Sequence, residues 1–310
     1  MIKKSAIRRI CVATLALFIL LIIYFFPSND NNIDQSLSYI SKDEMPIFLI
    51  DNQNYVARTS IIKDSNNDED QIKEIIESLT KGTKKEGYIR DGFKSIIPEN
   101  TKVYDLKIEN NILTINFSKE FLNIDEDNEE KMLEALIYSL TEIKTIKKIK
   151  ILVENKPLTE LPNSKKKLPE YLDKEYGINK IYNVTSLKDT TKTTTYYISK
   201  YNNYYYYVPV TKIDNDKLEK VNIIIKELKT TPIYHTNLIS YLAASADITN
   251  YELLENSITL SFNNYLIANI KDNDILEEVK YSIALSLRDT YGINEVIFNI
   301  SDKDNYKLNI

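Results

Sequence analysis

The chain has 310 residues, of which 43% are hydrophobic and 27% are charged, and these fractions are those of a globular protein. Its 40 Lys and Arg residues against 45 Asp and Glu residues leave a formal net charge of −5. This balance gives no electrostatic reason to expect nucleic acid as a partner, because phosphate binding needs concentrated positive charge. The one cysteine, Cys11, excludes an intramolecular disulfide and a zinc site made of cysteines.

The N-terminal segment predicts a membrane anchor. Residues 10–26 carry no charged side chain, and a membrane-spanning helix needs about 17–25 apolar residues. Basic residues, which favour the cytoplasmic side, precede this run at Lys3, Lys4, Arg8 and Arg9. The alternative is a cleaved signal peptide, but its apolar core is about 7–15 residues long and its A-x-A-like cleavage site is missing here. We therefore expect residues 1–27 to be a cytoplasmic tip and single-pass anchor in the cell membrane, residues 28–44 a linker, and the bulk to be extracytoplasmic.

Residues 45–158 predict one α+β unit. The stretch "PIFLIDNQNYVARTSII" predicts two strands around an Asn-rich turn, and a helix follows with Ile72, Ile75, Ile76 and Leu79 on one face. Residues 103–117 alternate in polarity on both sides of Asn110 and Asn111, which predicts a hairpin with Tyr104, Leu106 and Ile108 on one face. A second helix and a closing strand complete the unit, with apolar positions at Met132, Leu133, Leu136, Ile137, Leu140, Ile149, Ile151 and Val153.

The same order of elements returns at residues 193–310. The phrase "ENSITLSF" from Glu255 repeats "ENNILTINF" from Glu109, and both lead to an amphipathic helix and a closing strand. Two acidic pairs predict capping boxes at the starts of these helices, Asp127 with Glu130 and Asp274 with Glu277. The predicted fold is α+β with two tandem repeats, each a small mixed β-sheet packed against two helices in the order ββαββαβ.

Residues 159–192 lie between the two repeats and predict a linker. This stretch contains Pro162, Pro169 and the basic cluster Lys165–Lys167. Prolines and clustered like charges interrupt regular elements, which favours a connecting segment.

Several stretches of the first repeat resemble the GerM domain family. They are "IIESLTKG" (75–82), "GFKSIIPENTKVYDLKIENNILTINFSKEF" (92–121) and "MLEALIYSLTEIKTIKKIKILVEN" (132–155). In the second repeat "YVPVT" (207–211) is similar to a strand of the family, whereas "ELKTTP" lacks the glycine that ends the family's helix. The resemblance covers most of both repeats and is clearer in the first.

The resemblance implies a bacterial envelope protein that acts in sporulation and germination in endospore-forming lineages. It implies association with the complex that joins mother cell and forespore, and a fold like the ring-building motifs of secretion systems. Known relatives are often lipoproteins, so the helical anchor expected here departs from the family. That departure leaves the assignment to the sporulation channel open.

The sequence predicts no catalytic, metal-binding or cofactor-binding residue. His235 is the one histidine, which excludes a site of several histidines, and no glycine-bracketed nucleophile accompanies it. The five glycines form neither nucleotide-binding pattern, G-x-x-x-x-G-K-[ST] or G-x-G-x-x-G. The acidic pairs Glu129–Glu130 and Glu277–Glu278 lie at predicted helix starts, where they suit the helix dipole and a solvated face. We therefore expect a protein that is not an enzyme.

A run of tyrosines supplies the candidate partner surface, formed by Tyr204, Tyr205, Tyr206, Tyr207 and Pro209. Tyrosine favours strands, so alternation predicts that half of the run is core and half is exposed. Exposed tyrosines can contact a protein or stack on sugars. Pro209 lacks a backbone N–H, which predicts an edge strand or a bulge and hence a site for strand addition.

Three functions remain open from the sequence. The first is a non-enzymatic envelope protein that assembles with other sporulation proteins, or with itself. The second is a peptidoglycan-binding module that uses the exposed tyrosines. The third is a wall hydrolase, which the missing catalytic residues disfavour.

Overall fold

The computed structural model describes residue 14 and residues 43–186, 188–230, 237–266, 275–300 and 304–310. The chain divides into two compact units, Met1–Ser36 and Leu37–Ile310, and the second contains both repeats. The predicted anchor at residues 10–26 lies outside the described residues except for residue 14. No helix among the described residues is long and apolar enough to span a membrane.

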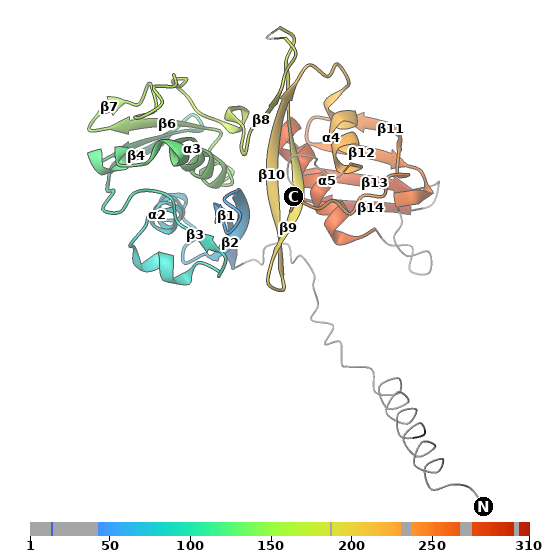
Figure 1. Cartoon of the computed structure of the whole chain (residues 1–310), viewed down its shortest axis with the longest axis horizontal. Helices are drawn as coiled ribbons and strands as arrows, with labels where there is room; N and C mark the ends of the chain where they lie inside the picture. The colour runs from blue at the N-terminus through green and yellow to red at the C-terminus, as the bar shows by residue number, and fades with distance from the viewer. Residues whose placement is uncertain (1–13, 15–42, 187, 231–236, 267–274, 301–303) are drawn as a thin grey trace, which may run out of the picture. The chain divides into compact units, whose positions relative to one another are not determined.

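The first repeat begins with a hairpin and a helix, as predicted (Figure 1). Strands β1 (Glu44–Asp51) and β2 (Val56–Ile62) pair antiparallel, and α2 (Asp68–Leu79) follows. The Asn67 side chain accepts hydrogen bonds from the first backbone N–H groups of α2, which stabilises the helix start. The remaining elements are η1 (Lys84–Tyr88), β3 (Phe93–Lys94), β4 (Val103–Glu109), β5 (Ile112–Phe117), η2 (Lys119–Leu122), α3 (Glu126–Leu140), β6 (Lys148–Val153) and β7 (Lys156–Pro157).

The second repeat has the same order of main elements. Its front hairpin is long, with β9 (Thr191–Tyr201) paired to β10 (Tyr204–Asp214) along the whole length. The elements that follow are α4 (Lys220–Leu228), β11 (Ile248–Leu253), β12 (Ser257–Phe262), η4 (Asn264–Leu266), α5 (Glu277–Tyr291), β13 (Glu295–Ile300) and β14 (Asp304–Asn309).

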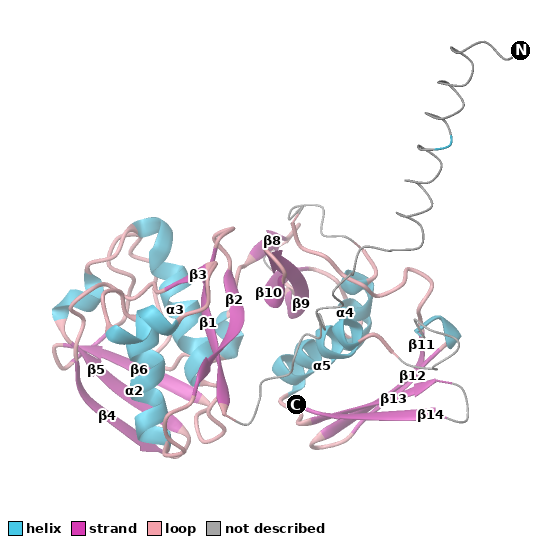
Figure 2. Cartoon of the chain, turned by 90° about the horizontal axis from the view of Figure 1, so that it is seen from below, coloured by secondary structure: helices cyan, strands magenta, loops and turns pink. Residues whose placement is uncertain are grey.

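Each repeat contributes strands to two sheets, which differs from the single sheet that the sequence predicted. Strands β4-β5-β6-β7 form one four-stranded sheet, and β11-β12-β13-β14 form the other. Figure 2 shows the helices of each repeat lying between its front hairpin and its four-stranded sheet. This arrangement explains why every residue of α3 from Met132 to Leu140 is buried, since the helix is covered on both sides.

The front hairpins of the two repeats join in a shared sheet. This six-stranded sheet has the order β3-β1-β2-β10-β8, with β9 paired to β10. The repeats meet where β2 and β10 pair antiparallel at Arg58 and Tyr207. Pairing across two repeats cannot be read from the polarity pattern of either hairpin, which is why the sequence did not predict it.

The segment between the repeats is packed against both of them. Leu161, Leu172 and Ile178 are buried in the core of the first repeat. The segment also contains η3 (Lys174–Tyr176) and β8 (Ile181–Asn183), and β8 pairs parallel with β10 of the second repeat. The connection therefore forms part of the junction between the repeats.

A buried hydrogen bond between the front hairpin and the last helix occurs in both repeats. The Ser139 Oγ on α3 accepts from the backbone N–H of Phe48 at 2.8 Å, and the Ser286 Oγ on α5 accepts from that of Tyr196 at 2.9 Å. Both serines are fully buried. Each bond satisfies a strand N–H that would otherwise be unpaired in the core.

Two local predictions are wrong, and a third falls partly outside the described residues. The residue that caps α3 is Asp125, and it makes no side-chain capping bond, so the predicted box of Asp127 and Glu130 is absent. Helix α5 begins after Leu276, again without a side-chain cap, and Asp274 lies outside the described residues. The side chain of Tyr104 is exposed, because a bulge between Val103 and Asp105 shifts the register of β4.

Candidate functional site at the junction of the repeats

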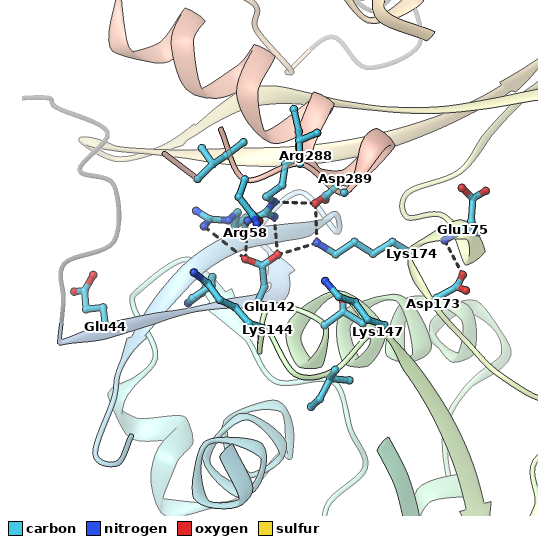
Figure 3. Close-up of a pocket in the computed structure, with 17 residues that line it drawn as sticks. Glu44, Arg58, Glu142, Lys144, Lys147, Asp173, Lys174, Glu175, Arg288 and Asp289 are labelled. Carbon is cyan, nitrogen blue, oxygen red and sulfur yellow. Dashed lines mark hydrogen bonds and ion pairs between the residues drawn. The ribbon is translucent and has the colours of Figure 1, made fainter. Parts of the chain in front are cut away.

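A cluster of buried charges joins the two repeats. Glu142 follows α3 in the first repeat, whereas Arg288 and Asp289 lie in the last turns of α5 in the second. Lys174 comes from η3 in the connecting segment, and Arg58 comes from β2 (Figure 3). The shared sheet therefore brings together side chains that are far apart in the sequence.

The two carboxylates of the cluster share two cations. Arg288 donates to Glu142 through Nη2 at 2.6 Å and Nη1 at 3.0 Å, and its Nε donates to Asp289 Oδ1 at 3.0 Å. Lys174 Nζ donates to Glu142 Oε1 at 2.9 Å and to Asp289 Oδ1 at 2.7 Å. The second oxygen of Asp289 accepts from the Tyr196 hydroxyl. All four carboxylate oxygens are thus hydrogen-bonded.

Burial and charge act in opposite directions on these acids. Burial raises the pKa of Glu142, but Arg288, Lys174 and Arg58 outweigh burial and hold the pKa well below its ordinary value. Burial likewise raises the pKa of Asp289, and Arg288 and Lys174 again lower it below the ordinary value. Both groups are carboxylates at neutral pH. Such weak bases suit binding and charge pairing more than proton transfer.

A cavity of about 580 Å³ opens beside the cluster. Both repeats and the connecting segment contribute to its walls, and Figure 3 shows Arg58, Lys144 and Lys147 there together with the buried charges. The Arg58 side chain is 7% exposed, and its Nε has no hydrogen-bond partner among the described residues. Within the described residues, no group of three or more His, Cys, Asp or Glu side chains could hold a metal ion.

The predicted tyrosine surface is divided between core and surface. Tyr206 and Tyr207 are 1% and 6% exposed, and Pro209 is also buried, so these three do not form an exposed surface. Tyr204 and Tyr205 are half-buried. Whether this pair contacts a partner stays a prediction.

Pro209 lies inside the sheet and not on an edge. Strand β10 pairs with β9 on one side, and on the other side it changes partner from β2 to β8. Pro209 stands at this change, and its carbonyl accepts from Asn179 Nδ2 at 2.8 Å. The same amide also bonds the backbone of Val56. The Asn179 side chain therefore pairs with β10 between the stretches that bond β2 and β8. Because proline has no backbone N–H, no donor of Pro209 is left unpaired there.

The other residues that the sequence singled out either make structural contacts, as Glu129 does, or lie outside the described residues, as His235 does. Glu129 is 1% exposed, and it accepts from the backbone N–H groups of Asn163 and Ser164 at 2.9 and 3.0 Å. It therefore anchors the connecting segment and does not lie on a solvated face. His235 lies outside the described residues.

The charge cluster was not predicted from the sequence. One signal was present, because Glu142 and Asp289 occupy matching positions in "SLTE" and "SLRD", which begin at the duplicated serines Ser139 and Ser286. An acidic residue kept at the same place in both copies is a weak indication by itself. Only the shared sheet shows that the two carboxylates meet.

Comparison with known proteins agrees with the duplicated fold. The chain is 28% identical over 277 residues to the spore germination protein GerM of Bacillus subtilis (strain 168). The aligned region covers 87% of this chain and 74% of that protein. The solved tandem GerMN domains of the sporulation protein GerM from Bacillus subtilis superpose with a TM-score of 0.76, at 24% identity, over 84% of this chain and 92% of that structure. Residues 24–159 match the model of the Germane family, described as sporulation and spore germination. Residues 24–159, which contain the first repeat, thus match the family that the motifs of this repeat resemble.

Proposed function

We propose that the protein is a non-enzymatic, membrane-anchored envelope protein that acts in sporulation or spore germination by protein–protein assembly. One observation carries the proposal: the similarity to the spore germination protein GerM extends over 87% of the chain and so includes both repeats. The tandem fold agrees with it. The chemistry of the junction also supports binding, since its carboxylates are fully paired and weakly basic.

The apolar run at residues 10–26 would hold the repeats at the extracytoplasmic face of the cell membrane, with the N-terminus in the cytoplasm. Anchoring raises the local concentration of the repeats and favours weak contacts with neighbouring envelope proteins. The channel between mother cell and forespore is the place that we propose for this assembly.

Matching grooves in the two repeats are the proposed assembly surface. A groove of about 780 Å³ runs between α2 and β4, and the equivalent groove of about 300 Å³ runs between α4 and β11. Among the described strands, β4 and β11 pair with a neighbour strand on one side only. Their outer backbone groups are therefore available to an added strand. We expect the partner to be another sporulation protein or a second copy of this chain.

Peptidoglycan binding is the second candidate. Tyr241 is 40% exposed and lies near Tyr205, and such aromatic pairs can stack on sugars. Tyr204 is less suitable. Arg90 lies 4.0 Å over the centroid of its ring, and Tyr206 stacks on that ring at 6.0 Å. These two contacts occupy the Tyr204 ring and therefore disfavour glycan stacking there.

The test is a count of heat-resistant spores in a strain deleted for the gene, with growth rate measured beside it. We expect a large drop in spore number at normal growth, restored by the wild-type gene. Normal spore numbers and normal germination would contradict the proposal. Binding of the purified protein to peptidoglycan, together with normal spores, would favour the second candidate.

Variants of two exposed tyrosines test whether the α2–β4 groove is the assembly surface. Tyr104 lines the α2–β4 groove and is 54% exposed, whereas Tyr88 is 78% exposed and does not line it. We expect Tyr104→Ala to lower spore number and partner recovery, and Tyr88→Ala to leave both unchanged. Equal behaviour of the two variants would move the assembly surface elsewhere.

A further inference from the structure

Arg58 is a buried cation whose bonding capacity is largely unused. A guanidinium carries five N–H donors, and burying such donors without partners is costly. The one ionic contact of Arg58 among the described residues is with Glu142 Oε2 at 3.9 Å, which is too long for a hydrogen bond. Its Nε has no partner there either. Arg58 also lines the 580 Å³ cavity, so its guanidinium borders space that a ligand can fill.

The charges of the buried cluster do not cancel. Arg58, Lys174 and Arg288 supply three positive charges against the two negative charges of Glu142 and Asp289. The oxygens of both carboxylates are already bonded by the other two cations or by Tyr196. Arg58 is therefore the cation with the weakest pairing, a single contact of 3.9 Å with an oxygen that Arg288 already bonds.

Two further cations stand at the mouth of the cavity. Lys144 and Lys147 are exposed residues of the loop after α3, and both line the cavity. Figure 3 shows their side chains rising from this loop toward the buried cluster. The cavity wall also contains acids, Glu44, Asp173 and Glu175. In Figure 3 the carboxylates of Glu44 and Glu175 lie apart from Arg58, and Asp173 accepts from the backbone N–H of Glu175.

We propose that this cavity binds a small molecule with a phosphate or carboxylate group, with Arg58 as the buried anchor and Lys144 and Lys147 as outer contacts. The planar fork of arginine matches both anions and forms paired, charge-assisted hydrogen bonds with them. The volume lies within the range of about 300–1,000 Å³ that is usual for small-molecule sites. A bound anion would supply the charge and the acceptors that Arg58 lacks.

Calorimetric titration of the full-length protein in detergent tests the site, with inorganic phosphate and citrate as probes and chloride at the same ionic strength as the baseline. We expect saturable binding of at least one probe with one site per chain. Tighter binding of phosphate would assign the ligand to the phosphates, and tighter binding of citrate to the carboxylates. Arg58→Leu should raise the dissociation constant about tenfold or more, which is the usual effect of losing a charge-assisted hydrogen bond.

Variants at the cavity mouth keep the test valid if Arg58→Leu does not fold. The double variant Lys144→Ala/Lys147→Ala changes exposed side chains only, and it should bind the probe several-fold more weakly. The matched control Lys81→Ala/Lys119→Ala removes two exposed lysines that do not line the cavity, and it should bind like the wild type. Two results would overturn the proposal: phosphate and citrate that bind no better than chloride, or cavity and control variants that bind alike.

Discussion

The two repeats share their apolar framework and differ where they touch. Each has a front hairpin, a serine that links the last helix to this hairpin, and a carboxylate three residues after the serine. Relative to these serines the helices end differently. Helix α3 ends at Leu140, next to Ser139, whereas α5 continues past Ser286 to Tyr291. The extension places Arg288 on the helix, where it bridges Glu142 of the first repeat and Asp289 of its own.

The two copies therefore agree at core positions and differ at positions that lie at the junction. Apolar positions fill two equivalent cores and stay apolar in both copies, as at Phe117 and Phe262. The position before the carboxylate is Thr141 in one copy and Arg288 in the other. One such change supplies a cation that binds both carboxylates.

The largest effect is expected for Glu142→Ala. Removing this carboxylate leaves the buried Arg58 and the half-buried Lys174 and Arg288 around a single acid, and breaking a buried ion pair costs about 3–5 kcal/mol. Urea denaturation should report this loss in the free energy of unfolding. Glu160→Ala is the control, because the Glu160 carboxylate pairs with Lys167 at an exposed site, and it should change stability very little. Equal losses of unfolding free energy in both variants would mean that the junction cluster stabilises the fold no more than an exposed ion pair does.

Acidification should weaken the junction in a way that depends on Glu142. The folded-state pKa of Glu142 is below its unfolded value, which is about 4.3, so its stabilisation is complete above that pH and is lost as the pH falls below it. Asp289 acts in the same direction. The stability of the wild type should therefore fall below about pH 4 more steeply than that of Glu142→Gln. Parallel curves from pH 7 to pH 2 would contradict this assignment.

The duplicated serines should have equal and moderate effects. Ser139→Ala and Ser286→Ala each leave a buried strand N–H unpaired, at Phe48 and Tyr196, which costs about 1–3 kcal/mol. The unfolding free energies of the two single variants should agree closely. A large effect in one variant only would show that the bond is structural in one repeat and incidental in the other.

The smallest expected difference concerns the two hairpin turns. Asn110 and Asn111 both have positive φ, 51° and 62°, which alanine adopts at a cost of about 1–2 kcal/mol. Asn111→Ala should therefore destabilise the first repeat by about this amount. In the second repeat Glu255 has no positive φ, and Glu255→Ala should be neutral. Thermal melting of both variants checks the contrast, and a neutral Asn111→Ala would contradict it.

Local features of the fold could be predicted from the sequence, and contacts between distant segments could not. The stripe of Ile72, Ile75, Ile76 and Leu79 predicts α2 because helical periodicity is written in consecutive residues. The alternation around Asn110 and Asn111 predicts the β4–β5 hairpin for the same reason. The pairing of β2 with β10 depends on two hairpins that look self-sufficient in the sequence.

The candidate site was harder to predict than the fold. Glu142, Lys174 and Arg288 resemble ordinary surface charges near helix ends, and only the packing of the repeats makes them buried partners. The tyrosine run was easier to notice but misleading. Its strand lies inside the shared sheet, so Tyr206 and Tyr207 are core residues and only Tyr204 and Tyr205 reach the surface.

We expect the shared sheet and the charge cluster to make the two repeats one cooperative unit. Scanning calorimetry of the wild type measures this cooperativity. We predict a single transition for the repeats, with calorimetric and van't Hoff enthalpies that agree, and a splitting of that transition in Glu142→Ala. Two separate transitions in the wild type would contradict this expectation, because the repeats would then unfold independently despite the sheet and ion pairs that join them.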